Sequence, residues 1–282
     1  MTTATAPDVL PTSSAGAGFA GGHIAEITAE LGAGVTVHDM YDPVGSAVYD
    51  DISRNDHHEI REILAATRSV SGDVLDLAAG SGRLTVPLLA SGRTVTALEL
   101  SDTMLELLRR RLSGLPAELR DRAAVVAGDM RYFRLPTTFG VIVLGTTSIS
   151  LLDEAGRAAL FERVQEQLAP GGSFLISTLQ IAAGAATDAC SDVMGASGRM
   201  YRLHERVDPA AGIRSVVIHP ATPDAAQQVC ASAVRIVRPE VLAAELSRQG
   251  LRIERSRALP TGSDRYRDAL LTVGRIEPGG AR

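Results

Sequence analysis

The feature that most constrains the fold is an apolar run that ends in a glycine-containing turn, followed by a second run that ends in an acid. Residues 74–83 read Val-Leu-Asp-Leu-Ala-Ala-Gly-Ser-Gly-Arg, and residues 95–100 read Val-Thr-Ala-Leu-Glu-Leu. The first run predicts a buried parallel strand, and Gly80 and Gly82 let the backbone approach a ligand where a Cβ would clash. We expect a helix to begin at Arg83. Glu99 would then lie at the carboxyl end of the second strand, where its carboxylate can accept hydrogen bonds from both hydroxyls of a ribose.

A dinucleotide site is the first alternative, because a Gly-x-Gly turn with an acid about 20 residues later also binds NAD. The third glycine of that fingerprint is absent, since Thr85 occupies its place. No basic residue is obviously directed at a phosphate. The pattern therefore favours a nucleoside ligand that carries no phosphate.

Three later segments extend the same pattern. Residues 123–127 predict a strand, and Asp129 follows it at a position where it could accept from an adenine amino group while Met130 packs on the ring. The continuously apolar run 139–144 predicts a strand covered on both faces, and it continues into Gly145-Thr146-Thr147. Leu168-Ala-Pro-Gly-Gly172 is expected to end a helix before a fifth strand over residues 173–177.

The motif Asp-Leu-Ala-Ala-Gly-Ser-Gly-Arg and the three later segments, in this order, resemble class I S-adenosylmethionine (SAM) methyltransferases. The resemblance implies an α/β fold, with a Rossmann-like seven-stranded sheet, N-terminal lid helices and a small antiparallel β cap inserted after the fifth strand. It implies SAM as cofactor and S-adenosylhomocysteine (SAH) as product. The residues that it assigns to the cofactor are Tyr49, Asp76, Ala78, Gly80, Gly82, Arg83, Glu99, Leu100, Met104, Gly128, Asp129, Met130, Leu144, Gly145 and Thr146.

Composition narrows the class of protein. The chain has 282 residues, 45% of them apolar, and 28 basic against 33 acidic residues give a net charge of -5. This balance does not favour nucleic acid as the main partner. Cys190 and Cys230 are too few for a disulfide scaffold or a zinc site, and Asp129 and Asp153 are too isolated to predict a metal. No apolar run reaches the roughly 18 residues of a membrane span and no secretory signal is evident, so we expect a cytoplasmic protein.

The order of patterns predicts how the chain is organised. Residues 1–22 are expected to be a disordered leader, 23–70 lid helices, 71–180 the SAM-binding core, 181–238 the cap, 239–276 the rest of the core and 277–282 a tail. A first helix should span 23–31 and end at Gly32. The alternating runs 199–207 and 213–219 predict a hairpin, and 228–238 could add a third strand. A helix over 239–250 should precede two strands, the last of them antiparallel.

Five residues are candidates for the acceptor site. Tyr49 resembles the lid tyrosine of small amine methyltransferases, and it is expected to act in catalysis as well as cofactor binding. His204 faces His219 across the hairpin and could point into the cap as a general base. Structural interpretations compete with both functional ones. Tyr49 could be a tyrosine packed at the surface, and His204 could be an exposed polar residue. Tyr41, Thr147, Tyr201 and His204 complete the expected substrate contacts.

A narrower resemblance suggests the acceptor. Residues 74–85 and 144–152 look like methyltransferases of ribosomal-peptide clusters, particularly the daptide type, which implies direct in-line N-methylation of a terminal amine, once or twice. Residues 128–135 and the cap layout are nearly as similar to sugar N,N-dimethyltransferases. O- or C-methylation of a small metabolite stays open, and the complete set of cofactor residues argues against a SAM-binding accessory subunit. The sequence leaves the oligomeric state open, a homodimer included.

Overall fold

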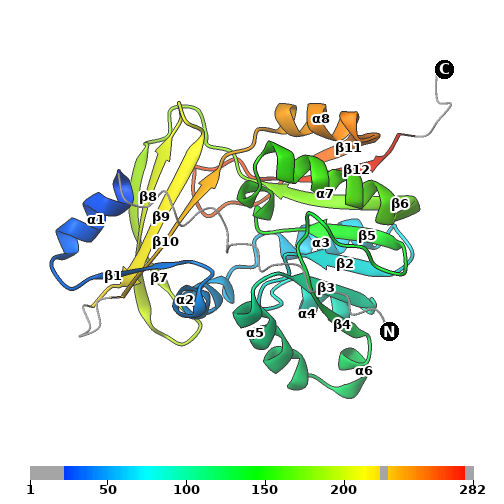
Figure 1. Cartoon of the computed structure of the whole chain (residues 1–282), viewed down its shortest axis with the longest axis horizontal. Helices are drawn as coiled ribbons and strands as arrows, with labels where there is room; N and C mark the ends of the chain where they lie inside the picture. The colour runs from blue at the N-terminus through cyan, green and yellow to red at the C-terminus, as the bar shows by residue number, and fades with distance from the viewer. Residues whose placement is uncertain (1–21, 223–227, 277–282) are drawn as a thin grey trace, which may run out of the picture.

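Two β-sheets stand side by side in the computed structural model, which describes residues 22–222 and 228–276 (Figure 1). The expected tail, and all of the expected leader except Gly22, lie outside the described residues. One sheet has seven strands and the other has five.

The seven-stranded sheet has the order β11-β12-β6-β5-β2-β3-β4. Its strands are β2 (Val74–Leu77), β3 (Val95–Glu99), β4 (Ala123–Ala127), β5 (Phe139–Leu144), β6 (Leu168–Thr178), β11 (Leu251–Ala258) and β12 (Ala269–Arg275). β12 is antiparallel to both β6 and β11, which confirms the expected last strand. From β2 the chain continues to β3 on one side, whereas β5 pairs with β2 on the other. Ligands bind at the carboxyl ends of strands beside such a reversal of strand order.

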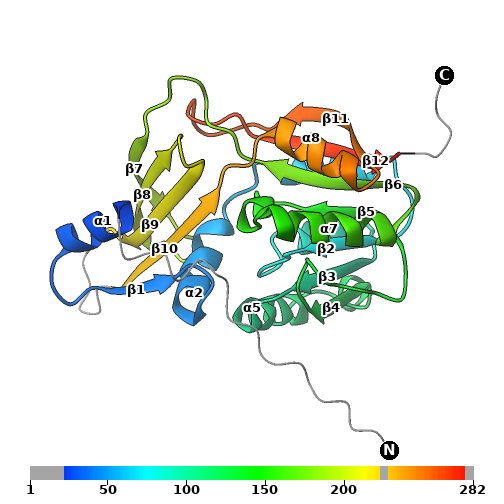
Figure 2. The same cartoon turned by 45° about the horizontal axis from the view of Figure 1, so that its top comes forward.

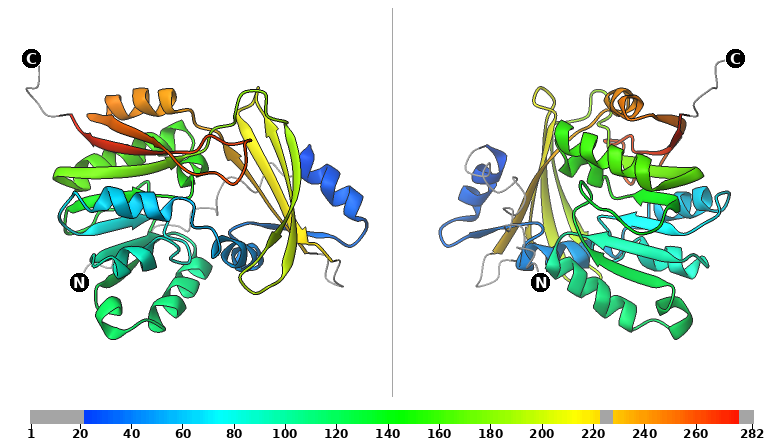
Figure 3. Two further views of the ribbon diagram at one scale, coloured as in Figure 1. Left: turned by 180° about the vertical axis from the view of Figure 1, so that it is seen from behind. Right: turned by 45° about the vertical axis from the view of Figure 1, so that its right-hand side comes forward.

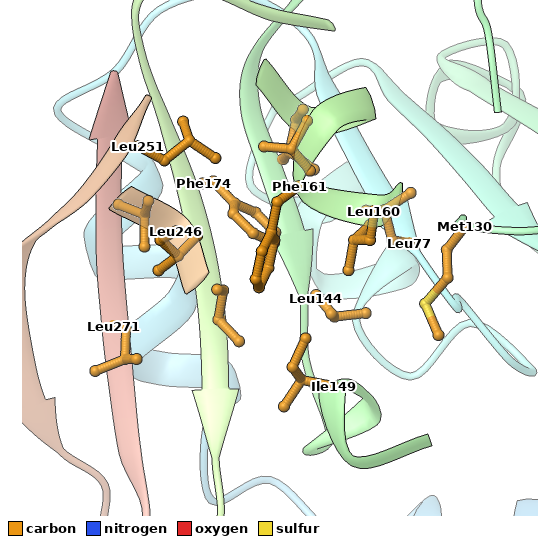
Figure 4. Packing of buried hydrophobic residues seen from close by; sticks show 14 of the residues in the cluster. Leu77, Met130, Leu144, Ile149, Leu160, Phe161, Phe174, Leu246, Leu251 and Leu271 are labelled. Carbon is orange, nitrogen blue, oxygen red and sulfur yellow. The ribbon is translucent and has the colours of Figure 1, made fainter. Parts of the chain in front are cut away.

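Helices cover both faces of this sheet. α3 (Ile60–Thr67), α4 (Thr85–Ala90) and α5 (Asp102–Ser113) pack on one face, and α7 (Glu154–Gln167) and α8 (Pro239–Arg248) pack on the other. Figure 4 shows the core between the sheet and the helices α7 and α8, where the Phe161 and Phe174 rings meet edge to face with centroids 6.3 Å apart. Short helical turns at α6 (Ala117–Arg120) and η1 (Ser148–Leu151) complete the domain. Burial on both faces explains the unbroken apolar run of β5.

Two predicted boundaries are wrong. The helix after the glycine turn begins at Thr85 rather than at Arg83, which stays in the turn. β6 begins at Leu168, because Phe139 pairs with Leu168 and Val141 pairs with Ser173. The Pro-Gly-Gly segment therefore bulges out of the strand instead of separating it from the helix.

The five-stranded sheet has the order β1-β10-β9-β8-β7. Its strands are β1 (Thr36–Asp39), β7 (Asp188–Met194), β8 (Met200–Asp208), β9 (Ile213–Pro220) and β10 (Gln228–Arg235). β8 and β9 form the predicted antiparallel hairpin. The sheet is larger than expected, since β7 extends one edge and β1, from the segment expected to be helical, pairs parallel with β10 at the other.

The helices between residues 23 and 70, the range expected to form the lid, lie in three different positions. α1 (His23–Leu31) ends before Gly32 as predicted and packs on the face of the five-stranded sheet that points away from the larger sheet (Figure 3). α3 covers the seven-stranded sheet, with Ile63 fully buried. α2 (Pro43–Ser53) contacts both β10 and α5 and so lies between the two sheets (Figure 2).

The position of α2 depends on a glycine in its first turn. A Cβ on Gly45 would overlap the carbonyl oxygen of Asp39 and approach the Cα of Met40 to 2.8 Å. We expect Gly45→Ala to lower the free energy of unfolding by about 1–2 kcal/mol, because overpacking against the backbone costs about 2–3 kcal/mol and the gain in helix propensity is roughly 1 kcal/mol. Urea unfolding measures this change. Ala47→Ser, on the exposed side of α2, is the control, and an equal or smaller loss in Gly45→Ala would contradict the packing argument.

Candidate functional site

The glycine turn and Glu99 form one hydrogen-bonded unit at the carboxyl edge of the larger sheet. Glu99 Oε2 accepts from the Gly80 N–H at 2.8 Å, and Oε1 accepts from the N–H groups of Leu100 at 2.9 Å and Ser101 at 2.8 Å. A Cβ on Gly80 would meet nothing within 4 Å, whereas one on Gly82 would approach Leu108 Cδ1 to 2.6 Å. Gly80 therefore faces open space, whereas a side chain at Gly82 would displace Leu108 and would be strained at the φ of 91°.

Backbone strain is concentrated at the same edge. The non-glycine residues with positive φ in the described part of the chain are Ala78 at 51°, Thr146 at 56° and Thr147 at 55°. All three directly follow or nearly follow the ends of β2 and β5. Strained backbone of this kind persists where the surrounding structure holds it in place, commonly at ligand sites.

Asp76 lies beneath the turn rather than in the open. Its side chain is buried, and Oδ2 accepts from the Thr85 hydroxyl at 2.6 Å. Burial raises the pKa of Asp76 to about 7, although the Thr85 hydrogen bond opposes the shift. The carboxyl thus links β2 to the start of α4.

The expected adenine end has one open apolar residue and two buried ones. Leu100, directly after β3, is 61% exposed, whereas Met104 and Met130 are buried in the core. Asp129 accepts from Arg131 Nε at 3.0 and 2.9 Å, so an adenine amino group would share this carboxylate with Arg131. The Gly128 N–H donates to the Glu99 carbonyl at 2.9 Å and ties the end of β4 to β3.

A buried ion pair joins the glycine turn to the end of β5 and the segment before α3. Arg83 Nη2 donates to Glu59 Oε1 and, at 2.7 Å, to the Thr146 hydroxyl. Glu59 Oε1 also accepts from the Thr146 N–H at 2.8 Å, while Glu59 Oε2 is buried with no partner. Gly145 packs against Leu84 and this Glu59 carboxylate, and Leu144 is buried in the core. Sequence reasoning missed Glu59, since nothing in its local pattern marks it.

A cavity of about 250 Å³ lies between this edge and the inner face of the five-stranded sheet. It is lined by Tyr41, Tyr49, Asp56, His58, Thr146, Thr147, Ser148, Ser150, Leu151, Leu179, Arg214, Ser232, Val234, Tyr266 and Asp268. The structure thus brings together four predicted residues, Tyr41, Tyr49, Thr146 and Thr147. Ser148, Ser150 and Leu151 follow Thr147 in the same segment, whereas Arg214, Tyr266 and Asp268 come from parts of the chain that the sequence did not connect with this edge.

Tyr41 and Tyr49 lie close together in the cavity wall, with ring centroids 5.9 Å apart. Burial raises the pKa of Tyr49 to about 12 and the pKa of Tyr41 further still. Both hydroxyls therefore stay protonated near neutral pH. Tyr49 can donate a hydrogen bond or orient a ligand, but it is a poor proton acceptor.

His204 does not reach the cavity. It pairs in register with Val217, whose side chain packs against α1, so both residues point to the outer face of the sheet. Its Nε2 lies 3.0 Å from His219 Nε2, on that same face. Tyr201 is on the inner face, but it is buried and its hydroxyl donates to Asp51 at 3.0 Å outside the cavity lining. The expectation that the hairpin brings a histidine to the acceptor is corrected, because strand alternation directs His204 away.

His58, and not His204, is the histidine that lines the cavity. Its Nδ1 lies 2.5 Å from Asp56 Oδ1, and its Nε2 lies 4.0 Å from Asp268 Oδ2. The hydrogen bond with Asp56 raises the pKa of His58 above its ordinary value of 6.5, against the opposing effect of burial. The histidine pair at 57 and 58 is visible in the sequence, but a partner more than 200 residues later is not.

A larger groove of about 840 Å³ runs between α3, α4 and α5 and shares only Gly82 and Arg83 with the predicted site. It gathers six arginines, Arg54, Arg61, Arg68, Arg83, Arg110 and Arg111. Asp50 pairs with Arg54 and Arg111, and Glu59 pairs with Arg83, so several of these charges are neutralised locally. We place the reacting groups in the smaller cavity, which lies at the carboxyl edge of the sheet.

Among residues 22–222 and 228–276, no group of three or more His, Cys, Asp or Glu side chains is arranged to hold a metal ion. Within the same ranges, none of the helices is both long and apolar enough to cross a membrane.

Comparison with known proteins gives consistent results for the larger domain. A family model described as a methyltransferase domain matches residues 74–172. The curated rRNA adenine N-6-methyltransferase of Corynebacterium diphtheriae is 33% identical over 87 residues, which is 31% of this chain. The chain matches only about a third of the length of that relative, 32%.

Several solved methyltransferase structures, among them the two that follow, are similar over most of the chain. The glycopeptide N-methyltransferase MtfA in complex with SAM is 37% identical, has a TM-score of 0.65, and the match covers 91% of this chain and 98% of MtfA. CalS10 of Micromonospora echinaspora, an amino pentose methyltransferase involved in calicheamicin biosynthesis, is 21% identical with a TM-score of 0.61. That match covers 83% of this chain and 98% of CalS10, and it shows the fold alone.

Proposed function

This chain belongs to the SAM-dependent methyltransferases, and from that premise we propose that it N-methylates a primary amine of a natural product, such as the terminal amine of a modified peptide. The similarity to a glycopeptide N-methyltransferase supports a peptide acceptor, and the resemblance of residues 128–135 to sugar N,N-dimethyltransferases makes an amino sugar the second acceptor to test.

The residues at the carboxyl edge fit SAM. Gly80 leaves open space where a side chain would stand, and Glu59 Oε2 is a buried acceptor with no partner. Glu99 would hold the ribose, Asp129 and Leu100 the adenine, and Glu59 with Arg83 the charged methionine end. When bound, SAM supplies an electrophilic methyl group on a sulfonium sulfur.

The protein's part in this reaction is to position the acceptor and exclude water. The cavity lies beside Thr146 and under the rings of Tyr41 and Tyr49, so an acceptor there is next to the cofactor edge. Desolvation beside a positive charge lowers the pKa of an amine and favours its reactive neutral form. At about 250 Å³ the cavity is smaller than most ligand sites. It therefore suits the amine-bearing end of a larger molecule.

One observation carries the choice of an amine over a hydroxyl or carbon acceptor. The carboxylates of Asp56 and Asp268 both line the cavity, and Asp268 Oδ1 is buried with no hydrogen-bond partner. The guanidinium of Arg214, the nearby positive charge, is already paired with Glu205 at 2.6 Å. A substrate ammonium would satisfy the free carboxylate oxygen, which a neutral acceptor does only weakly.

Mass spectrometry after incubation with SAM tests the proposal. The acceptors are a dipeptide amide with a free terminal amine, an amino sugar and a phenol, each with its N- or O-acetylated form as control. We expect one or two methyl groups on a free amine and none on its acetylated form. Methylation of the phenol alone would contradict the proposal.

A further inference from the structure

His58 is held between two carboxylates from distant parts of the chain. Asp56 is in the same loop, whereas Asp268 directly precedes β12. Because β12 runs antiparallel to the other strands, its first residues lie at the edge where the parallel strands end. The fold thus places Asp268 opposite the loop between α2 and α3.

The loop that carries His58 is fixed to the glycine turn. Arg83 Nη1 donates to the Asp56 carbonyl at 3.0 Å, and Arg83 also pairs with Glu59. The backbone N–H of His58 donates to Asp56 Oδ1 at 3.2 Å, in addition to the contact from Nδ1. The imidazole is therefore oriented by its own loop, with Nδ1 engaged and Nε2 directed to Asp268.

The gap between His58 and Asp268 is the size that one nitrogen could bridge. The 4.0 Å between Nε2 and Oδ2 is too long for a direct hydrogen bond, but a nitrogen donor to one side of the line that joins them could lie about 2.9 Å from both atoms. The Asp268 side chain is 12% exposed and that of His58 is 26% exposed, so the pair is partly shielded but open to the cavity. No other histidine lines the cavity among the described residues.

We propose, on the basis of the amine acceptor inferred above, that Asp268 binds the acceptor as its ammonium and that His58 Nε2 removes the proton, with Asp56 orienting the imidazole. One nitrogen–hydrogen bond of the ammonium breaks, and its electron pair remains on nitrogen as the nucleophilic lone pair. The proton moves to Nε2, and Asp56 stabilises the resulting imidazolium through Nδ1. The exposed side of His58 then returns the proton to solvent.

The charges around His58 determine its pH dependence. Asp56 and Glu59 from the same loop raise its pKa, and Arg83 from the glycine turn lowers it. Asp268 faces it from the start of β12, with Arg214 of β9 beyond. Since the net effect is a raised pKa and only neutral imidazole accepts a proton, kcat should rise with pH through a midpoint above 6.5.

Kinetics of a dipeptide amide with a free terminal amine test the two roles separately. His58→Gln should lower kcat about 100-fold to 1000-fold at neutral pH and remove the acidic limb of the kcat profile. Asp268→Asn should raise KM for the amine at least about tenfold and change kcat less. The matched control is His57→Gln, the exposed neighbour outside the cavity, which should behave as the wild type. SAH affinity, measured by calorimetry, should stay the same in all three variants.

Proton NMR of the histidine rings gives a second readout that needs no substrate. The His58 signal, assigned by its loss in His58→Gln, should titrate above 6.5 in the wild type and move lower in Asp56→Asn. If the wild type methylates no amine, the proposed function fails. If the wild type is active and His58→Gln keeps the wild-type kcat and pH profile, only the role of His58 fails. A His58 ring whose pKa is the same in Asp56→Asn as in the wild type would overturn the role of Asp56 as the partner of the imidazole.

Discussion

Glu99→Ala is expected to lower the affinity for SAM by about 100-fold or more. Two hydrogen bonds from ribose hydroxyls to a carboxylate are worth at least about 1.5 kcal/mol each, and every 1.4 kcal/mol is a tenfold change in affinity. The same change removes the acceptor of the Gly80, Leu100 and Ser101 N–H groups, so the turn also loses its anchor. Isothermal titration with SAM and with SAH measures the loss.

Asp102→Ala is the matched control for this experiment. Asp102 is an exposed carboxylate in the first turn of α5, three residues after Glu99, and it should leave SAM affinity unchanged. Circular dichroism would show whether Glu99→Ala keeps its fold. A folded Glu99→Ala protein that binds SAM as tightly as the control would refute the assignment of the ribose site.

The second large effect is expected for Asp76→Asn, which should stabilise the folded protein but weaken the binding of SAM. Asp76→Asn should raise the free energy of unfolding of the unliganded protein by about 2–4 kcal/mol at pH 8. The folded pKa of Asp76 is about 7, whereas an unfolded aspartate titrates near 3.9. The contribution of Asp76 to the stability of the wild type is therefore fully present below about pH 4 and is lost as pH rises through 7. The uncharged amide in Asp76→Asn does not titrate and does not show this loss. SAM affinity should fall at the same time, because the amide lacks the negative charge that the cationic end of SAM would meet beside the glycine turn.

Urea unfolding at pH 5 and at pH 8 separates this electrostatic effect from a change in packing. The advantage of Asp76→Asn should be large at pH 8 and small at pH 5. Thr85→Val, which removes the 2.6 Å hydrogen bond but keeps the shape, should instead destabilise the protein at both values. An advantage of Asp76→Asn that is the same at both pH values would show that the charge of Asp76 is not its cause.

The larger sheet could be predicted because its signals are local. The strands at 74–77 and 139–144 are short apolar runs that end in glycine turns, and burial on both faces leaves few alternatives for such runs. The helix start at Thr85 was misplaced by two residues, since positive φ at Gly82 keeps Arg83 in the turn. Helix ends depend on backbone angles that composition reflects only weakly.

The smaller sheet could be predicted only in part, because its geometry depends on pairing between distant segments. β1 is four residues long and becomes a strand by pairing with β10, about 190 residues later. Alternation along β8 places His204 and Tyr201 on opposite faces of the sheet, but the local sequence does not indicate which face points to the cavity. For the same reason the sequence shows His58 and Asp268 without showing that they meet.

The atom that receives the transferred methyl group distinguishes N-methylation from O- and C-methylation. The protein is incubated with SAM carrying a carbon-13 methyl group and the amine acceptor, and the carbon-13 NMR spectrum of the product identifies the atom to which the label is bonded. We expect a nitrogen-bound methyl group on the free amine. A label bonded to oxygen or carbon would contradict this expectation.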